Sequence, residues 1–215
     1  MGKSTLGAKR IWFDDITGKL NDTERGRLLG EFDTGDNILV LYKDGSLETC
    51  EVDLVKHFEL NDILYLGKIE THTVVTSVHF DGNKGWTMVK RFKVDGIKTN
   101  ERLSYLTDHK KSQMLFVSVK PKPRISYSIK IGSKKMDGGE VSLAEFIDIK
   151  GWKALGNKLS DQKLLDVKEV SRKDELDPTI ESNVEPIEND QENVETTKSN
   201  PRFQAGDTIE FDFGD

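Results

Sequence analysis

The sequence has few of the residues that build disulfide, membrane or secretion elements. It contains one cysteine, Cys50, among 215 residues, which excludes an intramolecular disulfide framework and is consistent with a reducing cytosol. No apolar run approaches the roughly 20 residues that span a bilayer. The first ten residues lack the hydrophobic core of a signal peptide. These absences predict a soluble cytoplasmic protein with no membrane partner.

Histidines are also scarce, and their spacing does not suggest a metal site. The chain has four of them, at positions 57, 72, 79 and 109, and none has ligand spacing with Cys50. His72 and His79 would lie on opposite faces of a strand because side chains alternate, so one strand cannot present both to one metal ion. Structural or surface roles are expected for all four.

Motifs for catalysis are missing or incomplete. Residues 2–5, GKST, resemble the end of a phosphate-binding loop, but no strand and no upstream glycine precede them. Asp14, Asp15 and Asp36 fit turns, and nothing pairs two carboxylates as acid and base. No GxSxG nucleophile motif occurs. We expect no catalytic residue, no metal and no cofactor in this chain.

Charge is distributed very unevenly. Residues 84–135 hold fourteen Lys or Arg and three acids, although the whole chain has a net charge of −6. Such a segment commonly contacts a polyanion, most often a phosphodiester backbone. The alternative is a solvated surface with no polyanion partner.

The C-terminal part of the chain is acidic. Residues 170–215 hold thirteen acids and four bases, with too little apolar surface to offset the entropy of ordering. We therefore expect a folded domain at 1–170 and an acidic, largely disordered tail at 171–215. Near the end, Ile209, Phe211 and Phe213 alternate with acids, which fits either an edge strand or a solvated terminus.

Alternating apolar and polar residues predict an all-β body. Residues 38–54 and 74–94 each read as a hairpin around a turn rich in Gly and Asp. A third hairpin is expected from residues 114–131, broken at Pro121 and Pro123. One helical start, a capping box at 142–145, leads to a helix that Gly151 limits to about two turns.

Short apolar strand starts recur along the chain. They begin at Arg10, Asp62, Gln113 and Lys163, which are 52, 51 and 50 positions apart. A period near fifty residues with about four short strands per unit is typical of propeller-like folds. The alternative is chance, because short apolar runs are common in β proteins.

Cations on the predicted strands form the candidate polyanion site. One face of the strand at 124–131 carries Arg124, Ser126, Ser128 and Lys130, whose donors bind phosphate oxygens without reading bases. Lys90, Arg91, Lys93, Arg124 and Lys130 are the predicted principal phosphate contacts. Further cations extend the set: Lys84, Arg102, Lys110, Lys111, Lys120, Lys122, Lys134 and Lys135. No zinc spacing, RNP aromatic motif or recognition helix indicates sequence-specific readout.

Four motifs stand in a fixed order along the chain. They are GAKRIWFDDITGKLN at 7–21, ERGRLLGEF at 24–32, FDG at 80–82 with VKRF at 89–92, and EFIDIKGWKALGNKL at 145–159. Together they resemble the C-terminal domain of the A subunit of bacterial type IIA topoisomerases over roughly residues 3–170. The similarity is closest to the topoisomerase IV A subunit and more distant from the gyrase A subunit. The ending GDTIEFDF at 206–213 also resembles the acidic C-termini of that group.

The resemblance implies a β-pinwheel, a disc of four-stranded blades whose basic rim binds and bends duplex DNA. About 170 folded residues at about 50 per blade allow three to four blades, so we expect an open disc. In that family the domain presents DNA to the cleavage core, so the implied partners are the N-terminal part of the A subunit and the ATPase B subunit. ATP and Mg²⁺ are implied only for the full enzyme, and a nucleoid-associated location follows. The catalytic tyrosine belongs to the N-terminal part, so this chain alone is expected to lack strand passage. The gyrase motif QRRGGKG has no counterpart here, which favours bending over gyrase-like wrapping.

Other functions remain open at this point. A propeller-like scaffold for protein–protein interactions would use the lysines only for solvation, and an enzyme with an unrecognised carboxylate site is more remote. DNA binding that charge reversal abolishes would exclude the scaffold, whereas a large acid-lined pocket would favour the enzyme. If DNA is the ligand, we expect the acidic tail to compete with it, because a tethered segment has a high effective concentration.

Overall fold

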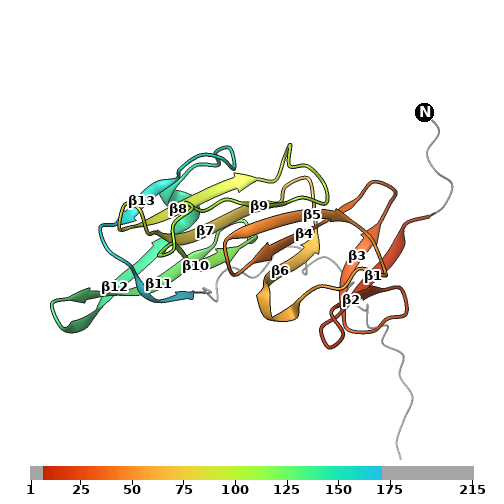
Figure 1. Ribbon diagram of the computed structural model, residues 1–215, viewed down its shortest axis with the longest axis horizontal. Coiled ribbons are helices and arrows are strands. Elements are labelled where there is room, and N and C mark those ends of the chain that lie inside the picture. Colours follow the sequence, from red (N-terminus) through yellow and green to blue (C-terminus); the bar gives the residue numbers. More distant parts are fainter. Residues whose placement is uncertain (1–6, 171–215) are drawn as a thin grey trace, which may run out of the picture. The chain divides into compact units, whose positions relative to one another are not determined.

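A computed structural model of the chain describes residues 7–170. Within them, short antiparallel strands form four sheets (Figure 1), which confirms the prediction of an all-β fold with open β-pinwheel blades. The predicted acidic tail at 171–215 lies outside the described residues. None of the described helices is long and apolar enough to cross a membrane.

We number the sheets as blades in chain order. Blade 1 contains β1 (Lys9–Asp14), β2 (Lys19–Asn21) and β3 (Arg27–Phe32), and blade 2 contains β4 (Asn37–Tyr42), β5 (Ser46–Glu51), β6 (Ile63–Lys68) and β9 (Arg102–Ser104). Blade 3 contains β7 (Val74–Asp81), β8 (Trp86–Lys93), β10 (Gln113–Ser118) and β13 (Asn157–Ser160), and blade 4 contains β11 (Arg124–Ile131), β12 (Lys134–Ser142) and β14 (Leu165–Glu169). A 3-10 turn, η1 (Leu60–Asp62), and one short helix, α1 (Leu143–Phe146), lie between strands.

All four blades are built in the same chain order. The first two strands of a blade form a hairpin, and its last strand, β3, β6, β10 or β14, pairs with the first strand of that hairpin. Before that last strand, the chain returns to the preceding blade. There β9 pairs with β5 and β13 pairs with β8, and a single bridge from His57 to Lys19 occupies the same place on β2. Neighbouring blades are therefore linked by strand exchange.

The fifty-residue recurrence is only partly structural. The starts at Asp62, Gln113 and Lys163 lead into β6, β10 and β14, which hold equivalent positions in blades 2 to 4. The start at Arg10 lies in β1, which begins a hairpin and corresponds to β4, β7 and β11 instead. This member of the predicted repeat was wrong, because an apolar start does not distinguish the first strand of a blade from its last.

The first two predicted hairpins are confirmed as β4 with β5 and β7 with β8. The third is wrong, since β10 pairs with β7 in blade 3 whereas β11 pairs with β12 and β14 in blade 4. Pro121 and Pro123 lie in the connection between the two sheets, where the missing proline N–H groups interrupt no ladder. The predicted capping box is also wrong. Ser142 makes no side-chain cap hydrogen bond, and α1 has one turn rather than two.

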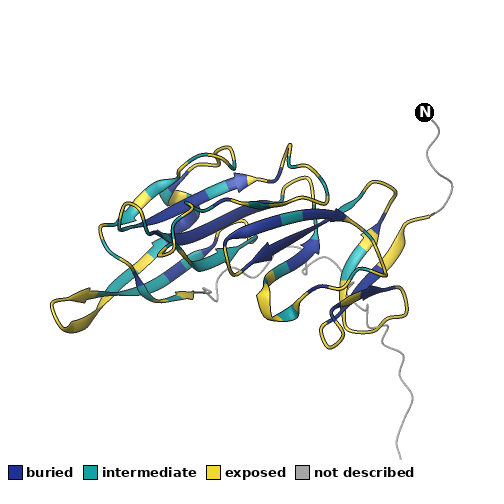
Figure 2. Cartoon of the chain, viewed as in Figure 1, coloured by how far each residue is buried: buried dark blue, intermediate teal, exposed yellow. Residues whose placement is uncertain are grey.

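Three hydrophobic clusters fill the spaces between successive blades. Ile38 and Val40 of β4 pack toward blade 1, whereas Leu39 and Leu41 of the same strand pack with blade 3, because side chains alternate along a strand. This is why 38–42 reads as a continuous apolar run rather than an alternating one. Figure 2 shows the buried residues concentrated in the central strands, and the tip of the β11–β12 hairpin exposed. Blade 4 contributes one face to the third cluster, through Ile125.

Candidate nucleic-acid interface

The predicted phosphate-binding face of β11 carries both signs of charge. Arg124, Ser126, Ser128 and Lys130 lie opposite the Ile125 side, as expected from strand alternation. The strand register then places two acids of β12 on this same face, with Glu140 beside Ser126 and Asp137 beside Ser128. On the other side of β11, Lys168 of β14 is paired with Ser126, so charges of both signs lie between Arg124 and Lys130.

The tip of the β11–β12 hairpin is the more positive part of blade 4. Lys130 is paired in register with Lys135, and Lys134 with Ile131, and the hairpin extends beyond its neighbouring strands at the left of Figure 1. Lys135 donates to Asp166 of β14, and this hydrogen bond lowers the pKa of that carboxyl. Among the described residues, Lys130 and Lys134 form no ion pair. We call Lys130, Lys134 and Lys135 the blade 4 tip.

A second group of cations gathers where three loops meet at one end of blade 3. The Gly82 N–H donates to the Ser112 hydroxyl at 3.1 Å, which holds the loop carrying Lys84 beside the loop carrying Lys110 and Lys111. Two further lysines come from the region of β13, since Lys158 lies over the Trp86 ring and Lys163 donates to Gln113 at the start of β10. We call Lys84, Trp86, Lys110, Lys111, Lys158 and Lys163 the blade 3 end.

The geometry of the blade 3 end suits a polyanion. The Nζ atoms of Lys84 and Lys158 lie 5.4 and 4.6 Å from the centroid of the Trp86 ring, so both ammonium groups contact the same indole. Its five lysines are opposed by Asp161, which pairs with Lys158, and by exposed Asp108. The charge therefore remains clearly positive.

Asp81 builds the turn that presents Lys84. Its carboxylate accepts hydrogen bonds from the N–H groups of Asn83 and Lys84 and from the Thr107 hydroxyl. Burial acts to raise the pKa of Asp81, but these hydrogen bonds and the charge of Lys84 lower it overall. The carboxylate is thus ionised, and its hydrogen bonds hold the two loops in place. Because Asp81 is buried, it adds no exposed negative charge to the surface.

Lys90, a predicted phosphate contact, is buried in the structure. Its side chain is 6% exposed, its ammonium donates to the Tyr105 carbonyl at 2.7 Å, and burial lowers its pKa to about 8. This burial contradicts the expectation of a principal phosphate contact. The sequence could have predicted this burial. Side chains alternate along a strand, so Lys90 lies on the same face of β8 as the buried Met88 and Phe92.

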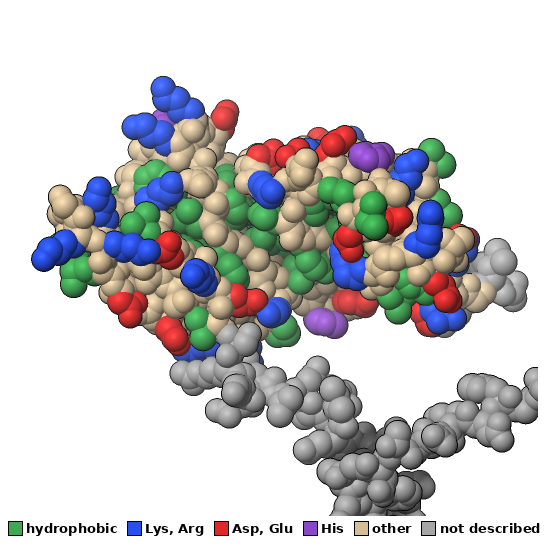
Figure 3. All heavy atoms as spheres, turned by 90° about the horizontal axis from the view of Figure 1, so that it is seen from below, with side chains coloured by type: hydrophobic (Ala, Val, Ile, Leu, Met, Phe, Trp, Pro, Cys, Tyr) green, Lys and Arg blue, Asp and Glu red, His purple; other side chains and the backbone are tan. Residues whose placement is uncertain are grey.

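Other predicted cations make contacts that support the fold, within a blade or between blade 3, blade 4 and their connection. Arg91 donates to the Pro121 carbonyl at 2.8 Å, and Lys120 pairs with Glu169 at 2.7 Å. Arg102 donates to Ser46 and Asp44, and its guanidinium lies 3.7 Å from the centroid of the Tyr42 ring. Lys93 and Lys122 are exposed. On the face that Figure 3 shows, Lys and Arg side chains are scattered, with acidic side chains and uncharged surface between them.

Lys158 and Lys163 were not predicted as site residues from the sequence. They lie outside the basic window at 84–135 and reach blade 3 only because β13 pairs with β8. Because β13 has only four residues, it has no recognisable apolar alternation, and the sequence does not predict its pairing with β8.

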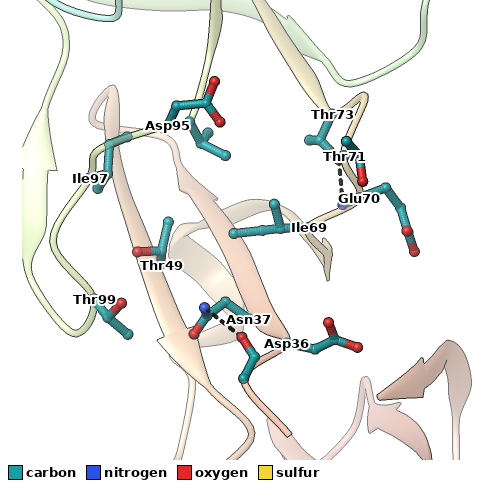
Figure 4. A pocket seen from close by; sticks show the side chains of 12 residues that line it. Asp36, Asn37, Thr49, Ile69, Glu70, Thr71, Thr73, Asp95, Ile97 and Thr99 are labelled. Atoms are coloured by element: carbon teal, nitrogen blue, oxygen red, sulfur yellow. Dashed lines mark hydrogen bonds between the residues drawn. The ribbon is translucent and has the colours of Figure 1, made fainter. Parts of the chain in front are cut away.

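A pocket of about 360 Å³ lies where loops of blades 2 and 3 meet, and three acids line it. Asp36 forms an ion pair with Lys68 at 2.8 Å, and the hydrogen bond from Lys68 lowers the pKa of this carboxyl. Glu70 and Asp95 extend from separate loops and do not point toward each other or toward Asp36 (Figure 4). No matched acid and base results. Within residues 7–170, no three His, Cys, Asp or Glu side chains are grouped to hold a metal ion.

His79 gives blade 3 a pH-dependent stability. The ring is buried and its Nδ1 atom has no hydrogen-bond partner among the described residues. Burial, assisted by Lys90, lowers its pKa to about 4. An unfolded chain binds the same proton near pH 6.5, so protonation favours unfolding below that pH. We expect the unfolding free energy to fall by about 3 kcal/mol between pH 6.5 and pH 4 because of this residue.

Urea titrations of the wild type and of His79→Gln across this pH range measure the effect. The His79→Gln variant should lose less stability on acidification than the wild type, whereas a variant at the exposed His72, His72→Gln, should follow the wild type. Equal pH dependence in all three proteins would show that His79 is not the group responsible.

A family model described as the topoisomerase C-terminal domain of Bacteroidota matches residues 19–172. The match runs from β2 to beyond β14 and so includes strands of all four blades. It confirms the resemblance to topoisomerase C-terminal domains that the sequence motifs indicated. A search of curated proteins found no match.

Proposed function

This chain belongs to the topoisomerase C-terminal domain family of Bacteroidota, and we propose that it binds duplex DNA without sequence preference and bends it. The observation that carries this proposal is the blade 3 end. Two of its five lysines, Lys84 and Lys158, lie over the Trp86 ring, the others come from the adjoining segments, and Lys side chains are common donors to phosphate oxygens.

The architecture supports contact with the DNA backbone rather than with bases. Reading the major groove generally takes an inserted helix or a two-stranded ribbon. The α-helix in the described residues has four residues, and the tip of the β11–β12 ribbon presents lysines, which suit phosphate oxygens. Phosphate contacts fix the position of a duplex without carrying sequence information. Nonspecific binding follows from such an interface.

Bending is supported by the presence of cations on two successive blades. The blade 3 end and the blade 4 tip belong to different sheets, so a duplex that contacts both would follow a path set by two blades instead of one flat surface. Bending a short duplex through 40–90° costs on the order of 1–6 kcal/mol, which additional phosphate contacts offset.

We place this activity in a type IIA topoisomerase of the topoisomerase IV kind. The partners would be the N-terminal part of the A subunit and the ATPase B subunit, with ATP and Mg²⁺ acting in those parts. The chain itself would deliver DNA to the cleavage core and perform no chemistry. The acidic tail at 171–215 would compete with DNA for the basic surface.

The test is a binding titration on labelled linear duplexes of unrelated sequence, followed by anisotropy at several salt concentrations. With about six phosphate contacts, the logarithm of the association constant should fall with the logarithm of salt with a slope of roughly −5. Energy transfer between dyes at the two duplex ends should increase on binding. Absence of binding at about 50 mM salt, or a slope near zero, would contradict the proposal.

A further inference from the structure

A second cavity between blades 2 and 3, of about 330 Å³, lies where the chain leaves β9 and where it approaches β13. His79 of β7 and Lys90 of β8 line it, together with residues 104–107 at the end of β9 and residues 152–155 before β13. Among the described residues, no Asp or Glu belongs to this lining. We call this space the Lys90 cavity.

Lys90 brings a buried charge to the cavity without an acidic partner. Its side chain is 6% exposed, and within residues 7–170 no carboxylate lies at ion-pair distance from its ammonium. The ammonium has three N–H donors, and one of them bonds the Tyr105 carbonyl. Lys56 and Lys68 are less buried, yet each pairs with a carboxylate. A buried charge is costly unless it is paired, so an anion in the cavity would stabilise Lys90.

The lysine keeps its charge at pH 7 despite its burial. Burial lowers the pKa of Lys90 to about 8, so about nine-tenths of the ammonium groups are protonated at pH 7. Asp81 lies two residues beyond His79 on β7, but it does not line the cavity, and its carboxylate accepts hydrogen bonds from the loops after β7 and β9. Exposed Lys153 adds a second positive charge to the wall. The charges at the cavity therefore favour an anion.

Two further buried polar groups at the cavity wall have no partner among the described residues. They are the Nδ1 atom of His79 and the hydroxyl of Tyr105, and the two residues are 2% and 4% exposed. Both residues line the cavity. Buried polar groups in native proteins usually have a hydrogen-bond partner. The wall therefore has hydrogen-bonding capacity beyond that of Lys90.

The remaining wall suits an apolar or aromatic group. Trp152, Leu106 and Leu155 line it. Small-molecule sites generally combine such a lining with a few polar groups, in a volume of roughly 300–1,000 Å³. The Lys90 cavity lies at the lower end of this range, and Lys90 is too deeply buried for the backbone of a duplex to reach it. A small molecule is the ligand that fits.

We propose that the Lys90 cavity binds a small organic anion, whose carboxylate or phosphate group contacts Lys90 and whose apolar part packs against Trp152 and Leu106. The anion supplies the counter-charge for the buried ammonium. Its apolar part gains from leaving water. The site lies between two blades and is separate from the exposed lysines of the blade 3 end, so the inference does not depend on DNA binding.

Nitrogen–proton NMR titrations of the full chain with phenyl phosphate, benzoate and benzyl alcohol test the proposal. The first two probes are anions with an aromatic ring, and the third is a neutral counterpart. We expect at least one anion to bind with a Kd of about 1 mM or lower, with saturating shifts of the amides at 105–107 and 152–155. Benzyl alcohol should bind at least roughly tenfold more weakly. The tighter of the two anions identifies the group that Lys90 prefers.

Lys90→Met and Lys93→Met form a matched pair on β8. Each removes one positive charge, and Lys93 is exposed. Lys90→Met should weaken binding of the tighter anion at least roughly tenfold, because a hydrogen bond to a charged group is lost. Lys93→Met should leave the affinity unchanged. Methionine keeps the length of the lysine stem and removes a buried charge, so the fold should tolerate it.

A further variant separates the cavity from the surface cations. The chain with Lys84→Glu, Lys110→Glu and Lys111→Glu should keep most of its affinity for the anion, and a loss as large as that of Lys90→Met would overturn the proposal. Equal losses in Lys90→Met and Lys93→Met would do the same. So would equal binding of the anions and benzyl alcohol, or the absence of saturating shifts up to about 10 mM. These last two outcomes need only the wild type and do not depend on how a variant folds.

Discussion

Replacing Lys84, Lys110 and Lys111 with glutamate should weaken binding to linear duplex DNA by roughly 500-fold or more at about 0.1 M salt. Each phosphate contact adds about 0.9 to the log–log salt slope, which at that salt concentration corresponds to roughly eightfold in affinity. Three lost contacts multiply to this figure, and the new negative charges add repulsion. The salt slope should become shallower by about three for the same reason.

The three lysines suit this experiment because their side chains are exposed and support no blade. Lys84 is held in its turn by its backbone N–H rather than by its ammonium. Substitutions at such surface positions generally change stability by less than about 0.5 kcal/mol. A loss of DNA binding with an unchanged urea transition would therefore report on the interface itself.

A control variant with the same net charge distinguishes a site from general attraction. Lys19, Arg25 and Lys98 are also exposed and lie outside the blade 3 end and the blade 4 tip. Their replacement by glutamate should weaken binding only slightly. Equal losses in the two triple variants would mean that total charge, and no particular surface, determines affinity.

Local patterns predicted the parts of the fold that local chemistry determines. The hairpins β4–β5 and β7–β8 were recognisable because an apolar run or apolar alternation lies beside a Gly-containing turn in the sequence. The exchanged strands β9 and β13 have three and four residues and pair with segments far away in the chain. Segments that short have no periodicity of their own, so their place in the sheets could not be predicted.

The candidate site, like the fold, was predicted only in part from the sequence. The count of charges along the chain identified Lys110 and Lys111. It also included Lys90, although Lys90 lies on the same face of β8 as the buried Met88 and Phe92. It also missed Lys158, which strand exchange brings over Trp86. An excess of cations in one part of the sequence predicts a surface that binds polyanions. Which residues belong to that surface depends on how distant strands pair.

Phe92→Ala should remove about 3–5 kcal/mol from the unfolding free energy, which is a large fraction of the 5–15 kcal/mol typical of a domain. The ring is fully buried in the cluster between blades 2 and 3, and its centroid lies 5.2 Å from that of Tyr105 at an angle of 59°. Tyr105 follows β9, which completes blade 2. The substitution therefore opens a cavity at the joint between two blades.

Urea unfolding followed by circular dichroism measures this loss, with Lys93→Ala as the matched control on the same strand. Lys93 is exposed, so its replacement should change stability by less than about 0.5 kcal/mol. A loss below about 1 kcal/mol for Phe92→Ala would mean that the two blades repack without the ring. If instead the transition splits into two steps, blades 2 and 3 unfold separately once this contact is removed, and the Phe92–Tyr105 pair is what couples them.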